Sequence, residues 1–176
     1  MAIDITPLIQ QLSVELSDNA YKASDTLGHI GSEEILQAMI ELLTHTNPDS
    51  RYMAARTLGL IENNEAALEA ILEAVTNQDN AAQAGDLLSA LEGFNVNSKY
   101  VEIFKLYLFG SFKVSLVAKE LLDYKEFDIT PRVLKKAQKH WNHYANNIKQ
   151  DDAFKLRKEE VDDMLDDLAV YVNRVC

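Results

Sequence analysis

The sequence predicts an all-α fold, an α-α superhelix of about ten helices arranged as antiparallel hairpins in a short solenoid. Three observations predict it. Apolar residues recur three and four positions apart, which is the spacing of one face of an α-helix. No stretch of the 176 residues alternates apolar and polar residues for long enough to indicate a strand. The chain also repeats itself about every 31 residues, as stacked helical hairpins do.

The clearest copies of the repeat lie at residues 26–30 and 57–61. They read Thr-Leu-Gly-His-Ile and Thr-Leu-Gly-Leu-Ile, and they are shifted by 31 positions. A third copy begins at Ala81, and a looser fourth copy covers residues 114–124. A single hairpin of this length cannot bury its apolar face alone, so we expect the copies to stack on one another.

Each copy is interpreted as two helices separated by turn residues. The first helix has small residues and leucines at helical spacing, such as Ala54 and Leu58, and the second has a broader apolar stripe. Gly31 ends one helix and Ser32 can cap the next, while Pro48 ends the helix before it. We expect helices at 6–17, 19–30, 33–45, 50–62, 65–76, 80–92, 98–109, 112–123, 131–146 and 152–175.

Both ends of the array are expected to carry caps, because terminal repeats would otherwise expose an apolar face. The C-terminal helix has a narrow apolar seam from Val161 to Val175 among acidic residues. This seam fits a cap, and it also fits a homodimer or docking helix formed by 152–175. We assign 1–176 to one domain, with an N-terminal cap helix in 1–18, about four hairpins in 19–146 and a C-terminal cap helix in 150–176.

Residues 49–61 carry a recognisable motif, which reads Asp-Ser-Arg-Tyr-Met-Ala-Ala-Arg-Thr-Leu-Gly-Leu-Ile. This segment resembles the start of a HEAT repeat of the short bacterial type, also called phycobilisome-lyase HEAT-like. The resemblance covers residues 19–125, and the first and third copies depart from it at the basic position, where Lys22 and Gln83 stand. It implies structural roles for Asp49, Arg51, Ala54, Leu58 and Gly59, with Asp49 and Arg51 building a ladder between repeats.

Charge is distributed unevenly along the chain, whose formal net charge is −11. Residues 1–98 carry a net charge of −12, residues 99–149 carry +5, and residues 150–176 carry −4. The overall negative charge argues against a general nucleic-acid-binding protein, which needs cations to neutralise phosphates. Such asymmetry affects which partners can approach which part of the molecule.

Two compartments are disfavoured by the sequence. No membrane span is predicted, because no run of about 18 apolar residues occurs. No secretory signal is predicted, because the first residues lack a basic region followed by an apolar stretch. The single cysteine, Cys176, allows no intrachain disulfide, which favours a reducing compartment and therefore a cytoplasmic protein.

Two charged features are candidate partner-binding sites. Carboxylates recur at helical spacing on the second helix of two repeats, and in the HEAT family the second helices line the concave side. Stacking therefore predicts an acidic groove, although a plain solvated helix face has the same pattern. The helix at 131–146 offers cations for an anionic partner. The candidates are Glu34, Gln37, Glu41, Glu65, Glu69, Glu73, Lys135 and Lys139.

No catalytic or metal-binding constellation is evident. His140 and His143 lie three positions apart on one predicted helix, but neighbouring lysines replace the acidic or cysteine partners that a metal site needs. Trp141 is expected in the core, because aromatic residues at helical spacing normally pack inward.

The sequence therefore predicts a non-enzymatic scaffold or adaptor that binds a protein partner through its partly acidic concave surface, without a cofactor or metal. A second hypothesis, which rests on the repeat type alone, is a lyase or chaperone that acts on a tetrapyrrole-bearing protein. A third is a HEAT-like nucleic-acid-processing protein, which the charge disfavours.

Overall fold

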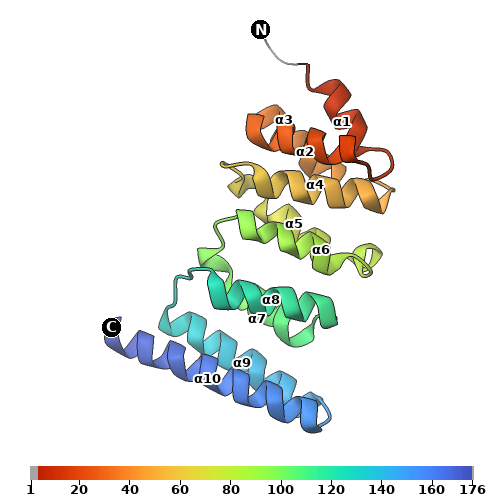
Figure 1. The fold of residues 1–176 in the computed structure, drawn as a ribbon. Coiled ribbons are helices and arrows are strands. Elements are labelled where there is room, and N and C mark those ends of the chain that lie inside the picture. The colour runs from red at the N-terminus through yellow and green to blue at the C-terminus, as the bar shows by residue number, and fades with distance from the viewer. Residues whose placement is uncertain (1–3, 176) are drawn as a thin grey trace. The chain divides into compact units, whose positions relative to one another are not determined.

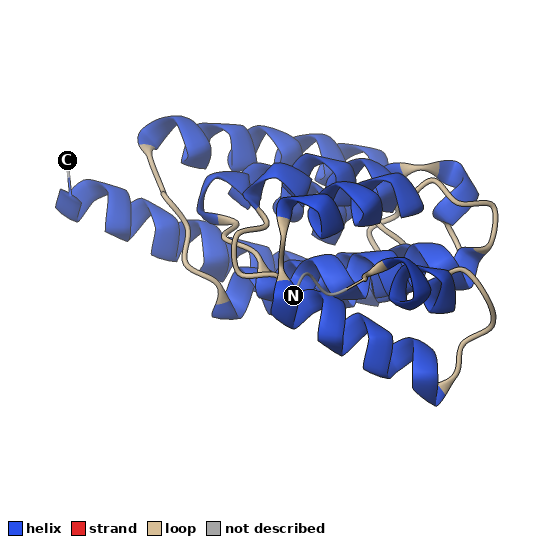
Figure 2. Ribbon diagram, turned by 90° about the horizontal axis from the view of Figure 1, so that it is seen from above, coloured by secondary structure: helices blue, strands red, loops and turns tan. Residues whose placement is uncertain are grey.

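The structure of the chain is a computed structural model, which describes residues 4–175. Every regular element in that range is an α-helix or a short 3₁₀-helix, which confirms the all-α prediction (Figures 1 and 2). The α-helices are α1 (Thr6–Leu12), α2 (Asp18–Ile30), α3 (Glu33–Leu42), α4 (Pro48–Leu60), α5 (Leu68–Thr76), α6 (Ala84–Leu88), α7 (Tyr100–Phe109), α8 (Phe112–Tyr124), α9 (Pro131–Asn147) and α10 (Asp152–Val175). The 3₁₀-helices are η1 (Glu65–Ala67), η2 (Gln78–Asn80), η3 (Ser89–Gly93) and η4 (Asn97–Lys99).

The helix expected at 6–17 was predicted too long, because α1 ends at Leu12. Ser17 has an extended backbone, and its hydroxyl accepts a hydrogen bond of 3.2 Å from the backbone nitrogen of Ala20. Ser17 therefore caps α2 instead of ending α1. Val14 and Leu16 continue the helical spacing in the sequence but are 57% and 41% exposed.

The helix expected at 80–92 is also a correction, because the segment forms η2, α6 and η3. The side-chain amide of Asn80 donates a hydrogen bond of 2.8 Å to the carbonyl oxygen of Ala74, so it ties this turn to α5. Gly85 and Gly93 further lower the helix propensity of the segment. The hairpin is therefore kept, but its first helix is short and irregular.

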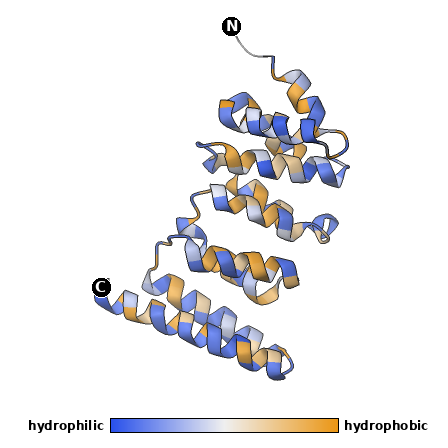
Figure 3. Ribbon diagram, viewed as in Figure 1, coloured by the Kyte–Doolittle hydropathy of each residue, from blue (hydrophilic) through white to orange (hydrophobic). Residues whose placement is uncertain are grey.

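The chain divides into two compact units, Met1–Asn95 and Val96–Cys176. The single domain assigned to 1–176 therefore stays a prediction, and each unit is considered by itself. Most helices in both units carry apolar residues on one side and polar residues on the other (Figure 3). No helix in the described part of the chain is long and apolar enough to cross a membrane.

Successive repeats of the first unit touch at the Leu-Gly pairs of the sequence repeat. A Cβ atom on Gly28 would lie 2.5 Å from Cβ of Leu60, and one on Gly59 would lie 2.8 Å from the carbonyl oxygen of Ala90. A Cβ atom on Gly93 would lie 1.7 Å from the carbonyl oxygen of Gly59. Glycine is needed at these positions because the side chain of Leu60, or the backbone at Ala90 and Gly59, occupies the space that a Cβ atom would fill.

A polar network also joins α2 to α4. The guanidinium of Arg56 donates to the hydroxyl of Ser24 and to the carboxylate of Asp25, each at 2.7 Å, and lies over the ring of Tyr21. The hydroxyls of Ser24 and Thr57 are both buried and lie 2.8 Å apart. These contacts fix the register between the two helices, because each hydroxyl must keep a partner once it is removed from water.

In the second unit, α10 packs against α9 and is tied to the α7–α8 hairpin. The rings of Trp141 and Phe154 stack with centroids 5.8 Å apart. Arg157 donates to the carbonyl oxygen of Tyr107 at 2.7 Å and to the hydroxyl of Ser115 at 3.0 Å. The hydroxyl of Tyr107 donates to Glu160 at 2.6 Å.

The apolar seam predicted for the C-terminal helix faces the interior of the second unit. Phe154, Val161, Leu165 and Val172 are all buried within the described chain. Their burial fits the cap hypothesis. Leu168 of the same seam is half-buried, and the homodimer through 152–175 stays a prediction. The last seam position, Val175, lies outside the described side chains.

The close approach at Gly59 makes the Gly59→Ala variant a test of the packing. In an open helix this change would stabilise the protein by about 1 kcal/mol. Here the methyl group would overlap Ala90, so we expect the free energy of unfolding to fall by about 1–3 kcal/mol in urea titrations followed by circular dichroism. Thr26→Ala, on the exposed face of α2, is the control and should be neutral or stabilising. A stabilised Gly59→Ala variant would contradict the close packing.

The buried hydroxyl of Tyr107 predicts an alkaline loss of stability. Burial, and then the hydrogen bond to Glu160, raise the pKa of Tyr107 above its ordinary value of 10.0. The folded chain therefore keeps this proton while the unfolded chain loses it, so the contribution is intact below pH 10 and is lost as the pH rises above 10.

The Tyr107→Phe variant isolates this group. It should lose about 1.5–3 kcal/mol at pH 8, because a hydrogen bond to a charged group disappears. Between pH 8 and 10.5 the wild type should lose about 0.8 kcal/mol more than the variant. Urea unfolding followed by the fluorescence of Trp141, the single tryptophan, measures both values in the second unit. Equal alkaline losses in the two proteins would refute the prediction.

Candidate functional site

The predicted acidic residues of the first repeat lie on the exposed face of α3. Ser32 caps this helix by accepting a hydrogen bond of 3.3 Å from the backbone nitrogen of Ile35. Glu34, Gln37 and Glu41 are exposed, while the other face of α3 is buried. The amide of Gln37 donates a hydrogen bond of 2.8 Å to Glu33, so the polar face is itself ordered.

The acidic residues of the second repeat are exposed in the same way. Glu65 lies in η1, and Glu69 and Glu73 lie in α5. The buried amide of Asn64 positions the start of this segment, because it donates to the carbonyl oxygens of Leu58 at 2.8 Å and Gly93 at 3.1 Å. The carboxylates therefore project from a segment whose backbone is held on two sides.

A cleft of about 310 Å³ lies between α3 and α5 and is called here the α3–α5 cleft. Apolar side chains and carboxylates both line it. Glu73 is the only member of the predicted acidic set among its lining residues, which are Ile40, Leu43, Thr44, His45, Arg51, Ala70, Glu73, Ala74, Asn77, Asp79 and Asn80. Asp79 also lines the cleft, although it was not among the acidic residues predicted to bind a partner.

The position of Asp79 had a signal in the repeat pattern. The side-chain oxygen of Asn47 accepts a hydrogen bond of 2.9 Å from the backbone nitrogen of Asp49. Asn77 makes the same bond at 2.9 Å with Asp79, one repeat later. The two turns are therefore equivalent, and aligning them places an aspartate two residues after each asparagine, with Asp49 at the start of α4 and Asp79 in η2.

Arg51 is fully engaged at one end of the cleft. Its guanidinium donates to the carbonyl oxygens of His45 at 2.7 Å and Thr46 at 3.0 Å. With the side-chain amide of Gln83 turned so that its oxygen faces Arg51, this oxygen accepts two further bonds from the guanidinium, at 3.0 and 3.1 Å, and so links α4 to the third repeat. The ladder role of Asp49 with Arg51 stays a prediction.

The remaining predicted repeat positions lie inside the first unit. Ala54 and Leu58 are buried completely, and Gly59 provides the close contact with Ala90. Their positions explain why small residues and leucines recur with the repeat.

The second candidate surface lies on α9, which begins at a well-defined cap. Thr130 accepts a hydrogen bond of 3.3 Å from the backbone nitrogen of Val133, and Pro131 occupies the first turn. Ala137 and Trp141 are buried, as Trp141 was predicted to be, and the opposite face is exposed.

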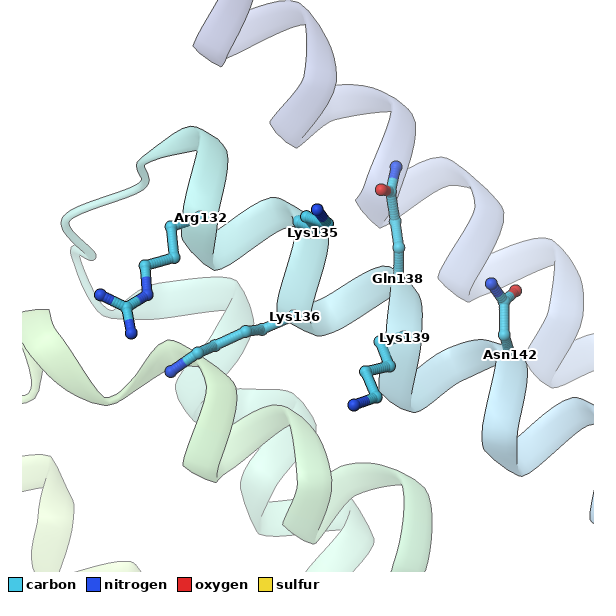
Figure 4. Close-up of a pocket in the computed structure, with 6 residues that line it drawn as sticks. All are labelled: Arg132, Lys135, Lys136, Gln138, Lys139 and Asn142. Atoms are coloured by element: carbon cyan, nitrogen blue, oxygen red, sulfur yellow. The ribbon is translucent and has the colours of Figure 1, made fainter.

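The exposed face of α9 carries Arg132, Lys135, Lys136 and Lys139, which we call the α9 basic face. With Gln138 and Asn142 they line a groove of about 630 Å³ (Figure 4). Lys135 and Lys139, the predicted anion-binding residues, are therefore joined by two further cations. The sequence showed these cations, but only as part of a charged run.

The histidines of α9 do not form part of a metal-binding cluster. Among the described residues, no three His, Cys, Asp or Glu side chains are placed to hold a metal ion. The half-buried imidazole of His140 lies in a positive environment. Burial, and then the charges of Lys105, Lys139, His143 and Lys136, lower the pKa of His140.

Comparison with known proteins identifies the repeat. A family model described as HEAT repeats matches residues 5–92. No curated protein gives a significant match to the chain. The phycobilisome-lyase subtype stays a prediction, because the matching model describes HEAT repeats in general. The match covers the unit in which the Leu-Gly contacts and the repeated Asn-x-Asp turns occur, and the chain belongs to the HEAT-repeat family.

Proposed function

We propose that the protein is a non-enzymatic scaffold or adaptor, and that its first unit binds a basic segment of a protein partner at the α3–α5 cleft. The observation that carries this proposal is the lining of the cleft, in which Glu73 and Asp79 stand beside an apolar floor. HEAT repeats generally mediate protein interactions.

The chemistry of the cleft suits a peptide with both cationic and apolar residues. Ile40, Leu43 and Ala70 offer apolar contacts, and the carboxylates offer partners for lysine or arginine. Glu34 and Glu41 on α3, with Glu65 and Glu69 on η1 and α5, extend the negative potential beyond the cleft. Such a field mainly raises the association rate and orients the partner.

Two features of the cleft restrict where the partner's cations can bind. Arg51 and His45 stand at one end, and Arg51 is held by carbonyl and amide oxygens. A cationic side chain is therefore expected nearer Glu73 than Arg51, because like charges repel at short distance.

Charge reversal tests the proposal. A fluorescein-labelled peptide of alternating lysine and leucine should bind the wild type, and Glu73→Lys with Asp79→Lys should weaken binding about tenfold. Fluorescence anisotropy at 50 and 150 mM salt measures the affinity, which should fall as salt rises.

The matched control is Glu15→Lys with Glu120→Lys, which changes the net charge equally at exposed positions outside the cleft. We expect the control to bind within about twofold of the wild type. Equal weakening by both pairs would show that only net charge matters, and unchanged binding by the cleft variant would refute the proposed site.

A further inference from the structure

The α9 basic face has a charge pattern that opposes the stability of its own helix. Arg132 lies in the first turn of α9, where the helix dipole disfavours cations. Arg132 and Lys136 are four residues apart, and Lys136 and Lys139 are three apart, so like charges are neighbours on one face. The 17-residue helix contains no acidic residue to compensate them.

These cations also lack partners elsewhere in the described structure. The four cations of the α9 basic face are all exposed. None of them makes a side-chain ion pair or hydrogen bond with another described residue. Other lysines of the same unit are paired, such as Lys119 with Asp123 at 2.6 Å. The repulsion between these cations therefore lowers the local stability, and no contact within the described chain offsets it. Such a pattern is typical of a ligand-binding surface.

We propose that the α9 basic face binds an acidic segment of a partner polypeptide. The proposal goes beyond the function proposed above, because the site lies on another helix and the ligand has the opposite charge. Lys136 lies about 6 Å from Arg132 and about 4.5 Å from Lys139 along the helix axis. These intervals match the spacing of carboxylates that lie three and four residues apart on one face of an acidic helix.

A polypeptide fits this face better than a nucleic acid does. No aromatic side chain is among the residues lining the groove, so it offers no stacking platform for bases. The net charge of −11 repels a ligand with the charge density of DNA more strongly than a short acidic peptide. The aliphatic stems of the lysines give a peptide further apolar contact.

The first experiment compares two anionic probes. A fluorescein-labelled 16-residue peptide of alternating Glu-Glu and Ala-Ala pairs and a labelled 16-nucleotide single-stranded DNA are titrated with the full chain at 100 mM salt. We expect the peptide to bind more tightly than the DNA. Tighter DNA binding, or no peptide binding, would overturn the proposal. Sedimentation measurements that show the protein associating with itself in a salt-dependent way, with loss of peptide binding, would also overturn it.

The second experiment localises the site with matched variants. Arg132→Gln with Lys136→Gln and Lys139→Gln should weaken peptide binding at least tenfold. The control, Lys22→Gln with Lys149→Gln and Lys158→Gln, removes three exposed cations elsewhere and should stay within about threefold. Equal losses in the two triple variants would overturn the proposal, because binding would then depend on net charge alone.

The same variants test the origin of the charge pattern. Removing three mutually repelling cations should leave the melting temperature of the α9 variant unchanged or raise it by about 2 °C. A clear fall would show that these side chains stabilise the unit, and would remove the argument for a ligand. His140 supplies a local signal: bound carboxylates should raise the pKa of His140 in an NMR titration, and an unaltered titration would overturn binding at this face.

Discussion

Backbone contact between successive repeats is the constraint on which the first unit depends. Gly59 and Gly93 let the segment that carries Ala90 lie directly against α4. Gly28 lets Leu60 of α4 lie directly against α2. Only at this distance can the leucines of neighbouring repeats exclude water from one another, since a single hairpin has no second face to cover its own. The carboxylates of α3 and α5 are exposed because apolar residues such as Met39 and Ile71 occupy the buried faces of these helices.

Polar side chains hold the frame at the points where helices end. The buried amides of Asn64 and Asn80 donate to carbonyl oxygens in the last turns of α4 and α5. The second unit uses another solution, in which Arg157 bridges a carbonyl and a hydroxyl beneath the ring of Tyr107. Both sets of hydrogen bonds restrict the conformation of the backbone that carries charged surface residues. This restriction lowers the entropic cost of binding a partner.

The sequence predicted the features that are encoded locally. Helices with a capping residue, such as α3 after Ser32 and α9 after Thr130, start at the expected residue because the cap is a contact over three positions. The helix at 6–17 was too long because Val14 and Leu16 keep helical spacing while remaining exposed. Spacing alone does not reveal whether another element arrives to cover a side chain.

The candidate surfaces likewise have some features that the local sequence predicts and others that depend on distant contacts. The exposure of Glu34 or Lys139 follows from the helical pattern. The α3–α5 cleft is formed by residues about 30 positions apart, so the local sequence pattern does not predict it. The lack of ion pairs on α9 was likewise invisible in the sequence, because it depends on which acidic residues fold close to the helix.

The repeated Asn-x-Asp turn has a consequence for how such chains can change in length. Asn47 and Asn77 build the same junction at the same point of successive hairpins. A recombination event that exchanged one junction for the other would delete or duplicate a whole hairpin. Each remaining turn would still have the same Asn-x-Asp hydrogen bond. The number of hairpins can thus vary in evolution, provided that each added hairpin has a glycine at its contact with the neighbouring hairpin.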